Sequence, residues 1–234
     1  MDIKTNTIVN DDILNVLPFI PNKTFDLVLT DMPYQQEAHG RGLSAKRPHL
    51  FKEMAEYTNL DNDWYNESIL SEYVRICKFP NMFLFCGKRD VYKCLKFAVD
   101  NGLEYWIIPL CKKSPLPFVN NTWLSSEFAV HIVDRKLTYT TNYDWKIPYF
   151  FIGGNRSVNH PNAKDKEMVK KVIYNITDKD GFIFDGFMGS GTTAVACMDT
   201  GRRFFGCEIN EKYYNLARQR IDEAYKYLDL FTER

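Results

Sequence analysis

The chain has 234 residues, 45% of them hydrophobic, and its 30 Lys and Arg residues balance 30 Asp and Glu residues. This length and apolar content suit one well-buried domain, and the zero net charge means that any nucleic-acid contact must come from local clusters of charge. No apolar stretch reaches membrane-spanning length and the first residues lack the apolar core of a signal peptide, so we expect a soluble, intracellular protein without a membrane partner.

Six cysteines and four histidines are dispersed without the paired spacing that a metal site requires. Most of the cysteines fall inside apolar patterns, so we expect reduced core residues and no bound metal.

Apolar periodicity predicts strands that alternate with helices along the whole chain. The predicted strands cover residues 7–9, 25–30, 82–86, 105–110, 128–133, 182–184 and 203–207. The predicted helices lie at about 13–17, 66–74, 91–98, 165–176 and 192–199, with a last one from Glu211 that should face the core through Tyr214, Ala217, Ile221, Ala224 and Leu228. This alternation predicts a single α/β domain, doubly wound around a mixed, mostly parallel sheet with helices on both faces.

The predicted strand at 25–30 runs directly into Asp31-Met32-Pro33-Tyr34. Proline cannot donate to a sheet ladder, so Pro33 must end the strand. Asp31 and Tyr34 are therefore expected at the carboxyl end of a strand, where open α/β sheets bind their ligands.

A second motif, Asp185-Gly-Phe-Met-Gly189-Ser-Gly191-Thr-Thr193, lies between a predicted strand and a predicted helix. Glycines allow a sharp turn and let a ligand lie against bare backbone, so we expect a side chain at Gly191 to block that approach. The next strand ends at Glu208, roughly 20 residues further on, a spacing that suits an acid that grips a nucleoside ribose.

Four interpretations of this turn stay open on the segment alone. A phosphate-binding P-loop lacks its lysine, because Thr192 stands in that place. A dinucleotide site fits Gly189-x-Gly191-x-x-Ala194, and an S-adenosylmethionine site would put Asp185 near the methionine end and Glu208 on the ribose. The last is a turn that only packs a helix on a sheet.

Taken together, three motifs resemble those of the DNA amino-methyltransferases, in the order of the permuted beta class. The first tetrapeptide resembles Asp-Pro-Pro-Tyr, the glycine motif resembles Asp-Pro-Phe-x-Gly-Ser-Gly-Thr-Thr, and His160-Pro-Asn-Ala-Lys164 resembles His-Pro-Thr-Gln-Lys. The similarity runs from about Asn10 to Ile221. Departures from the family pattern are Met32, Gly186, Asn162, Ala163 and Asp165.

The resemblance implies a Rossmann-like methyltransferase fold in permuted order, in the cytoplasm of a prokaryotic cell or phage-infected host. It implies an enzyme of restriction-modification that transfers a methyl group from S-adenosylmethionine to the exocyclic amine of a flipped-out base in double-stranded DNA. Because Asp at the first tetrapeptide position is commoner in adenine enzymes, adenine N6 is favoured over cytosine N4. Carried over to this sequence, the catalytic residues are Asp31, Met32, Pro33 and Tyr34, and the cofactor-binding residues are Asp31, His160, Lys164, Asp185, Phe187, Gly189, Ser190, Gly191, Thr192 and Glu208.

Two segments of the single domain 1–234 are expected to face DNA, residues 35–63 and 134–159. Residues 39–52 contain no acid, and the predicted DNA-binding residues are Arg41, Lys46, Arg47, Lys52, Lys112 and Lys113. A solvated loop is the alternative for the basic run, and the aromatic-rich, poorly periodic segment 134–159 could equally serve packing. A homodimer, a same-fold RNA or protein-amide methyltransferase and a nicotinamide-dependent oxidoreductase also stay open, although the last would leave the Asp31 tetrapeptide unexplained.

Overall fold

The computed structural model describes residues 3–33, 64–112, 126–138, 150–152 and 164–232. These residues build an eight-stranded sheet in the order β1-β8-β7-β2-β3-β5-β4-β6. The strands are β1 (Thr7–Val9), β2 (Leu27–Thr30), β3 (Asn81–Cys86), β4 (Glu104–Lys112), β5 (Ser126–Val133), β6 (Phe150–Ile152), β7 (Phe182–Asp185) and β8 (Arg203–Cys207). The helices are α1 (Ile13–Val16), the 3-10 turn η1 (Leu17–Phe19), α4 (Glu67–Ile76), α5 (Val91–Asp100), α6 (Lys166–Ile176), α7 (Thr192–Asp199) and α8 (Glu211–Thr232).

The sheet is mixed and mostly parallel, which confirms the predicted fold class. Among the described strands, β5 alone runs against its neighbours, pairing antiparallel with both β3 and β4, and the other pairs are parallel. No helix is described between β4 and β5, and strands joined without a long crossover can pair antiparallel, whereas parallel strands need one.

One strand lies inside the poorly periodic segment 134–159, where the sequence predicted none. Phe150–Ile152 forms the edge strand β6, which pairs parallel with β4 from Leu110 to Lys112. Three residues are too few to show the alternation that marks a strand in a sequence, so the partner strand decides this element.

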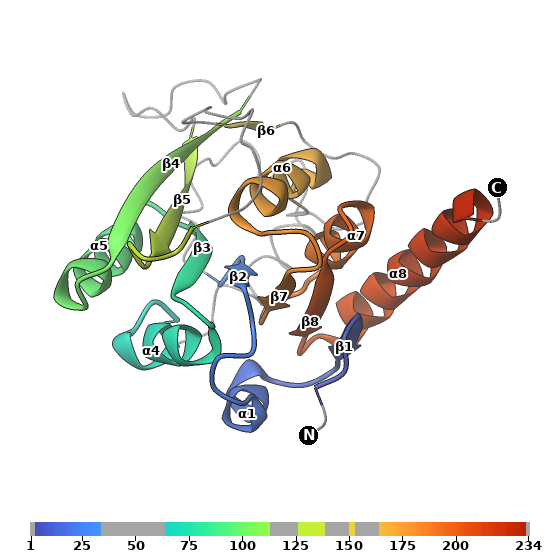
Figure 1. Ribbon diagram of the computed structural model, residues 1–234, viewed down its shortest axis with the longest axis horizontal. Coiled ribbons are helices and arrows are strands. Elements are labelled where there is room, and N and C mark those ends of the chain that lie inside the picture. Colours follow the sequence, from blue (N-terminus) through green and yellow to red (C-terminus); the bar gives the residue numbers. More distant parts are fainter. Residues whose placement is uncertain (1–2, 34–63, 113–125, 139–149, 153–163, 233–234) are drawn as a thin grey trace, which may run out of the picture.

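Helices cover both faces of the sheet (Figure 1). One core cluster packs α1, α4 and α5 on the first face, and a second packs α6, α7 and α8 on the other. The stripe predicted on the last helix is confirmed at Ala217 and Ile221, which are buried, while Tyr214 and Ala224 are partly buried. The side chain of Leu228 lies outside the described residues.

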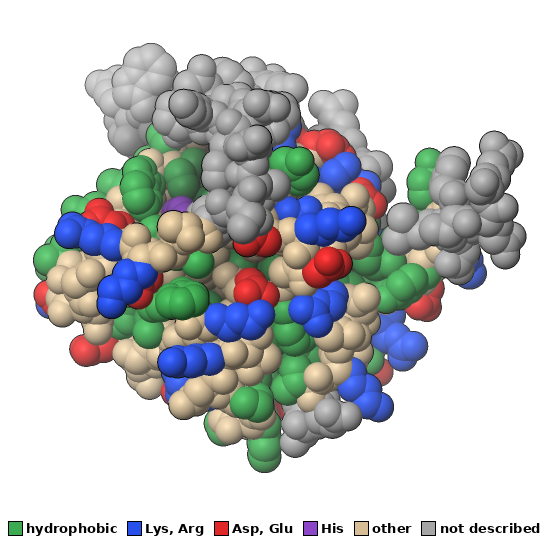
Figure 2. Space-filling view, viewed as in Figure 1, with side chains coloured by type: hydrophobic (Ala, Val, Ile, Leu, Met, Phe, Trp, Pro, Cys, Tyr) green, Lys and Arg blue, Asp and Glu red, His purple; other side chains and the backbone are tan. Residues whose placement is uncertain are grey.

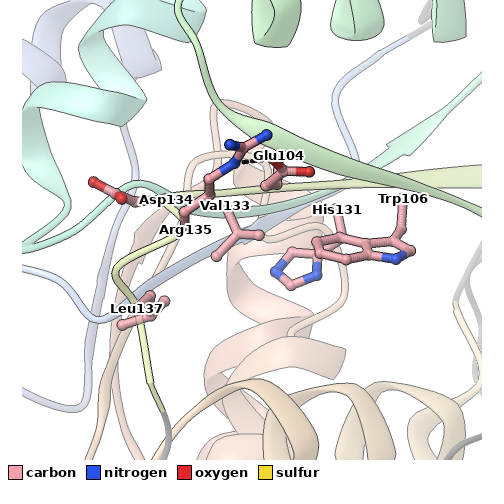
Figure 3. A pocket seen from close by; sticks show the side chains of 7 residues that line it. All are labelled: Glu104, Trp106, His131, Val133, Asp134, Arg135 and Leu137. Atoms are coloured by element: carbon pink, nitrogen blue, oxygen red, sulfur yellow. Dashed lines mark hydrogen bonds and ion pairs between the residues drawn. The ribbon is translucent and has the colours of Figure 1, made fainter.

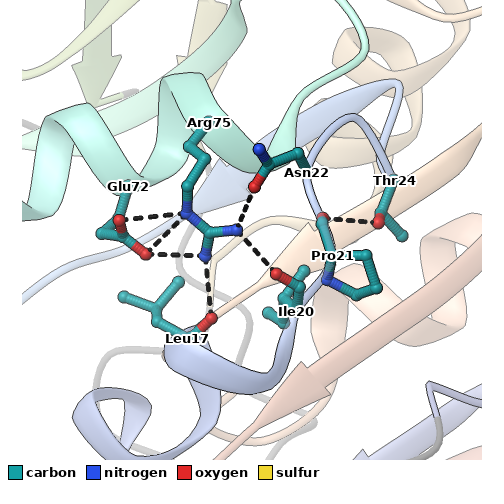
Figure 4. Close-up of polar contacts among 7 residues, drawn as sticks. All are labelled: Leu17, Ile20, Pro21, Asn22, Thr24, Glu72 and Arg75. Carbon is teal, nitrogen blue, oxygen red and sulfur yellow. Dashed lines mark hydrogen bonds and ion pairs between the residues drawn. The ribbon is translucent and has the colours of Figure 1, made fainter.

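The predicted helix start at Asn66 is confirmed, because its side chain accepts a hydrogen bond from the Ile69 amide at 3.0 Å. At the other end of α4, Arg75 donates to the carbonyls of Leu17 at 2.9 Å and Ile20 at 2.7 Å (Figure 4). The Glu72 carboxylate holds this guanidinium at 2.7 Å. The contacts tie α4 to the turn before β2 and so fix where β2 enters the sheet.

All six cysteines are free and all except Cys111 are buried, as predicted. Within the described ranges, no helix has both the length and the apolar character needed to cross a bilayer.

Candidate active site

The predicted catalytic and cofactor motifs meet at one edge of the sheet. Asp31 follows β2, Asp185 ends β7 and Glu208 follows β8, and these three strands are parallel neighbours. In the sheet, β7 and β2 are neighbours. The chain goes from β7 to β8 on one side of this pair and from β2 to β3 on the other side. The three acids therefore lie at the carboxyl ends of strands at a switch point in strand order, where open α/β sheets form their binding crevice.

A buried hydrogen bond joins the last residue of β2, just before the first motif, to the second motif. The Thr30 hydroxyl donates to Oδ1 of Asp185 at 2.8 Å, and the Phe187 amide donates to the same oxygen at 3.0 Å. Burial raises the pKa of Asp185 to about 6, although hydrogen bonds from Thr193 and Thr30 oppose that rise. Through the Phe187 amide, Asp185 therefore stabilises the start of the glycine turn.

Glu208 is held by two backbone amides, one in the glycine turn and one just after β8. The Gly189 amide donates to its Oε2 at 2.8 Å, and the Asn210 amide donates to Oε1 at 2.9 Å. Burial raises the pKa of Glu208, and these two amides counteract the effect. Each carboxylate oxygen keeps a further acceptor position, so Glu208 can still accept hydrogen bonds from two neighbouring hydroxyl groups.

The glycine turn has the shape expected, and the packing of α8 gives a further reason for one of its glycines. Gly189 and Gly191 have φ values of +53° and +79°, in the left-handed region that favours glycine. A Cβ at Gly191 would lie only 2.9 Å from Cβ of Ala217 in α8. A side chain here would press on α8, and the expectation that it would also block a ligand stays a prediction.

Arg220 on α8 clamps this turn, and the sequence did not single it out. Its Nη1 donates to the Ser190 carbonyl, to the Ser190 hydroxyl at 3.0 Å and to the Thr192 hydroxyl at 3.4 Å. Burial lowers the pKa of Arg220. In the sequence, the only indication of this role is that Arg220 stands next to the apolar stripe that contains Ala217 and Ile221.

The two oxygens of the Asp31 carboxylate differ: Oδ2 is paired with a lysine, and Oδ1, called the open oxygen below, is not paired with a described residue. Oδ2 lies 3.0 Å from the Lys164 ammonium, which also lies 3.4 Å from Oε2 of Glu127 and 5.1 Å from the centre of the Phe85 ring. Oδ1 is buried and has no hydrogen-bond partner among the described residues. Burial raises the pKa of Asp31, while the Lys164 charge opposes that shift. Oδ1 can therefore accept a hydrogen bond from a ligand.

Lys164 thus contacts the residue predicted to be catalytic. We expected it to bind the cofactor, but the partner that the structure shows is Asp31. Glu127, which follows the first residue of β5, is a site residue that the sequence analysis missed, because nothing in the pattern of a strand marks one acid as special.

Two aromatic residues just before α4 also belong to the site and were missed. The buried Tyr65 hydroxyl donates towards the carbonyls of Met32 and Phe85, at 3.2 and 2.5 Å. The Trp64 ring packs edge-on against Phe187 with centroids 4.9 Å apart. They follow a polar stretch without periodicity, which gave no signal.

The remaining predicted site residues stay predictions. Lys112 is the last residue of β4. Those outside the described residues are Tyr34, Arg41, Lys46, Arg47, Lys52, Lys113 and His160. On the described part of the face in Figure 2, positive and negative side chains are interspersed, in line with the zero net charge.

A pocket of about 270 Å³ lies elsewhere, between the end of β5 and the start of β4. Its walls include Trp106 and His131, and Arg135 pairs with Glu104 at its rim (Figure 3). Since β5 runs against β3, this end of the sheet is opposite the edge that carries Asp31. The pocket is therefore separate from the candidate active site.

Comparisons with known proteins agree with this geometry. A family model described as DNA methylase, of the N6 and N4 type, matches residues 134–219. The DNA adenine methyltransferase YhdJ of Escherichia coli K12 is 35% identical over 96% of this chain and 85% of its own length. The type II methyltransferase M.HinfI of Haemophilus influenzae is 24% identical over 93% of this chain and 68% of its own length.

Among solved structures, M1.HpyAVI has a similar fold, with a TM-score of 0.66 and 21% identity over 92% of this chain and 98% of that one. The extent of the match to YhdJ, together with the family model, decides the assignment. This chain belongs to the family of DNA N6-adenine and N4-cytosine methyltransferases, which use S-adenosylmethionine as the methyl donor.

Proposed function

We propose that this enzyme methylates N6 of adenine in double-stranded DNA, and that Asp31 and the Met32 carbonyl hold the target amine. The observation that carries the proposal is the buried Oδ1 of Asp31 at the switch point of the sheet, which has no hydrogen-bond partner among the described residues. A buried carboxylate oxygen without a donor is costly, so a site that keeps one is suited to a ligand that supplies the donor.

The chemistry needs an arrangement of this kind. An exocyclic base amine is a poor nucleophile, because its lone pair is delocalised into the ring. Hydrogen bonds from the amine to Asp31 and to the Met32 carbonyl would aim the lone pair, and orientation together with charge placement would supply most of the rate enhancement. S-adenosylmethionine supplies an electrophilic methyl group, and Asp31 need not remove a proton before the attack.

The cofactor would lie along the glycine turn. Glu208 offers acceptor positions for two ribose hydroxyls, and the turn at Gly189, Ser190 and Gly191 exposes backbone next to the start of α7. Phe187 would line the pocket, braced by Trp64. Asp185 and Thr192 support the turn, through Thr30 and Arg220 respectively. His160 stays in the proposed set on the strength of its motif alone.

For Lys164 we propose a role at the carboxylate. Its ammonium lies between Asp31 and Glu127, so it favours the ionised form of Asp31 and fixes one oxygen. The other oxygen is then free to face the amine.

Adenine is favoured over cytosine for two reasons. The first residue of the tetrapeptide is Asp, which the family resemblance associates with adenine enzymes, and the relative YhdJ is named an adenine methyltransferase. Cytosine N4 is the second candidate, because the family contains both kinds of enzyme.

The base must leave the duplex to reach this edge of the sheet, which costs a few kcal/mol. Tyr34 would stack on it, and the segments 35–63 and 134–159 of the single domain 1–234 would contact the DNA around it. The basic residues proposed for the phosphates are Arg41, Lys46, Arg47, Lys52, Lys112 and Lys113. The proposal allows a homodimer, which sedimentation of the purified chain would detect.

Mass spectrometry tests the target. Nucleosides from DNA treated with the enzyme and S-adenosylmethionine should contain N6-methyladenine, and N4-methylcytosine without methyladenine would overturn the assignment of the base. Asp31→Ala should lower kcat by about 10²- to 10³-fold or more and leave the Kd for S-adenosylmethionine within several-fold of wild type. Retained turnover would contradict the role of Asp31.

A further inference from the structure

The Tyr65 hydroxyl lies between the ends of two neighbouring strands. It is 3.2 Å from the Met32 carbonyl beyond β2 and 2.5 Å from the Phe85 carbonyl in β3, and the residue is 3% exposed. The registered pairs of β2 with β3 end at Thr30 and Leu84. Met32 therefore lies past the ladder, and the hydroxyl of Tyr65 contacts its carbonyl where the strand pairing has stopped.

A phenol has one proton, so at any moment Tyr65 donates to one of the two carbonyls. The pair of contacts still places the hydroxyl within reach of both, and a carbonyl has two acceptor positions. The Met32 carbonyl can therefore contact Tyr65 and keep one position for a second donor. The direction of that position depends on how firmly the carbonyl is held.

Phe85 connects both proposed amine acceptors. Its carbonyl lies 2.5 Å from the Tyr65 hydroxyl, which is also within reach of the Met32 carbonyl. Its ring lies 5.1 Å from the Lys164 ammonium, which holds Asp31. The Asp31 carboxylate and the Met32 carbonyl are therefore both positioned relative to Phe85 in the central strand β3. Sites held on strands are more precise than sites on free loops.

We propose that Tyr65 is a positioning residue for methyl transfer, whose hydroxyl fixes the Met32 carbonyl in the direction that accepts the target amine. The inference rests on the proposed role of Met32 in holding that amine. Tyr65 touches neither the amine nor the cofactor in this scheme, so its loss should affect the chemical step and spare cofactor binding.

The test is Tyr65→Phe, which removes one oxygen and keeps the packed ring. Its matched control is Tyr73→Phe, because the Tyr73 hydroxyl is also buried but has no hydrogen-bond partner among the described residues. Both variants and wild type are assayed for kcat, with labelled S-adenosylmethionine and unmethylated DNA amplified from a bacterial genome. The Kd for S-adenosylmethionine is measured by calorimetry, and the Tm by circular dichroism.

We expect Tyr65→Phe to lower kcat by about 10- to 100-fold with the Kd within about threefold of wild type. Tyr73→Phe should keep kcat within about twofold, because the Tyr73 hydroxyl has no hydrogen-bond partner within the described part of the chain. A kcat within about twofold of wild type for Tyr65→Phe, with Asp31→Ala inactive, would overturn the role of Tyr65 and leave the proposed function standing. Parallel losses in kcat, Kd and Tm would also overturn it, because they would make Tyr65 a packing residue. Turnover retained by Asp31→Ala would instead count against the proposed function itself.

Discussion

The ammonium of Lys164 lies 3.0 Å from Oδ2 of Asp31, on the side of the carboxylate away from its open oxygen. Glu127 holds the same ammonium at 3.4 Å. One cation shared by two carboxylates keeps Asp31 in a fixed orientation without occupying Oδ1. Burial by itself would favour the protonated acid, which is a poor acceptor, so the lysine also supports the charge state that the proposed reaction needs.

Lys164→Met should move the acid limb of the kcat–pH profile to higher pH. The ionised form of Asp31 is the active one, and removing a neighbouring positive charge raises the pKa of the carboxyl further above its ordinary value. Lys166→Met is the control, because its ammonium pairs with Asp199 at 2.9 Å and not with the site. An acid limb at the same pH in Lys164→Met would contradict this role.

Arg220→Met should weaken the binding of S-adenosylmethionine by about 10- to 100-fold, since hydrogen bonds to a charged group are worth about 1.5 to 3 kcal/mol. The guanidinium contacts Ser190 and Thr192, so its loss frees the glycine turn. At saturating cofactor, kcat should change much less. Arg218→Met, on an exposed position of the same helix, should bind normally in the same calorimetric titration. Equal Kd values for S-adenosylmethionine in the two variants would show that Arg220 does not support cofactor binding.

Gly191→Ala should destabilise the protein more than Gly201→Ala. Both glycines have positive φ, at +79° and +68°, so each alanine costs about 1 to 2 kcal/mol of backbone strain. Only at Gly191 does the new Cβ meet Ala217, and overpacking adds about 1 to 3 kcal/mol. Urea denaturation measures the difference. In a double-mutant cycle, Ala217→Gly should recover part of the extra loss, and no coupling would refute the contact.

Asp185→Asn should change how stability depends on pH. The folded pKa of Asp185 is about 6, above the value of about 3.9 for an unfolded chain, so the folded state binds this proton more tightly. The contribution of Asp185 to the free energy of unfolding therefore falls as pH rises from about 4 to about 6, by up to about 1.4 kcal/mol per unit. The Asn variant lacks this loss, so its stability relative to wild type should rise across that window. A constant difference in urea titrations would contradict the burial of an ionised Asp185.

Changing Arg41, Lys46 and Arg47 together to Ala should flatten the salt dependence of DNA binding. Each phosphate contact releases condensed counterions, so log K falls with log salt with a slope of about −0.9 per contact. The triple variant should lose roughly 2 to 3 units of slope, alike on all DNA sequences if the contacts are to phosphates only. Fluorescence anisotropy at several salt concentrations measures it, and an unchanged slope would mean that residues 39–52 are a solvated loop.

The sequence by itself determined the local elements and both principal motifs. Asn66 caps its helix as predicted, and β8 matches its predicted span. The strand–turn–helix around Gly189 and Gly191 forms where the glycines and the apolar run require it. These features depend on periodicity, capping and allowed backbone angles, which residues close in sequence decide among themselves. The carboxyl-end placement of Asp31 and Glu208 also followed, because parallel strands bring their ends to one edge.

Only the tertiary structure decided which side chains meet at that edge. Lys164 on Asp31, Tyr65 on Met32 and Arg220 on Ser190 each join segments far apart in the chain. The direction of β5 and the side of the turn that faces Ala217 were settled in the same way. Such pairings depend on strand register and on how helices pack against the sheet, and one sequence holds no periodic signal for either. Tertiary packing determines which distant side chains come into contact, whereas residues nearby in the sequence determine a turn or a helix cap.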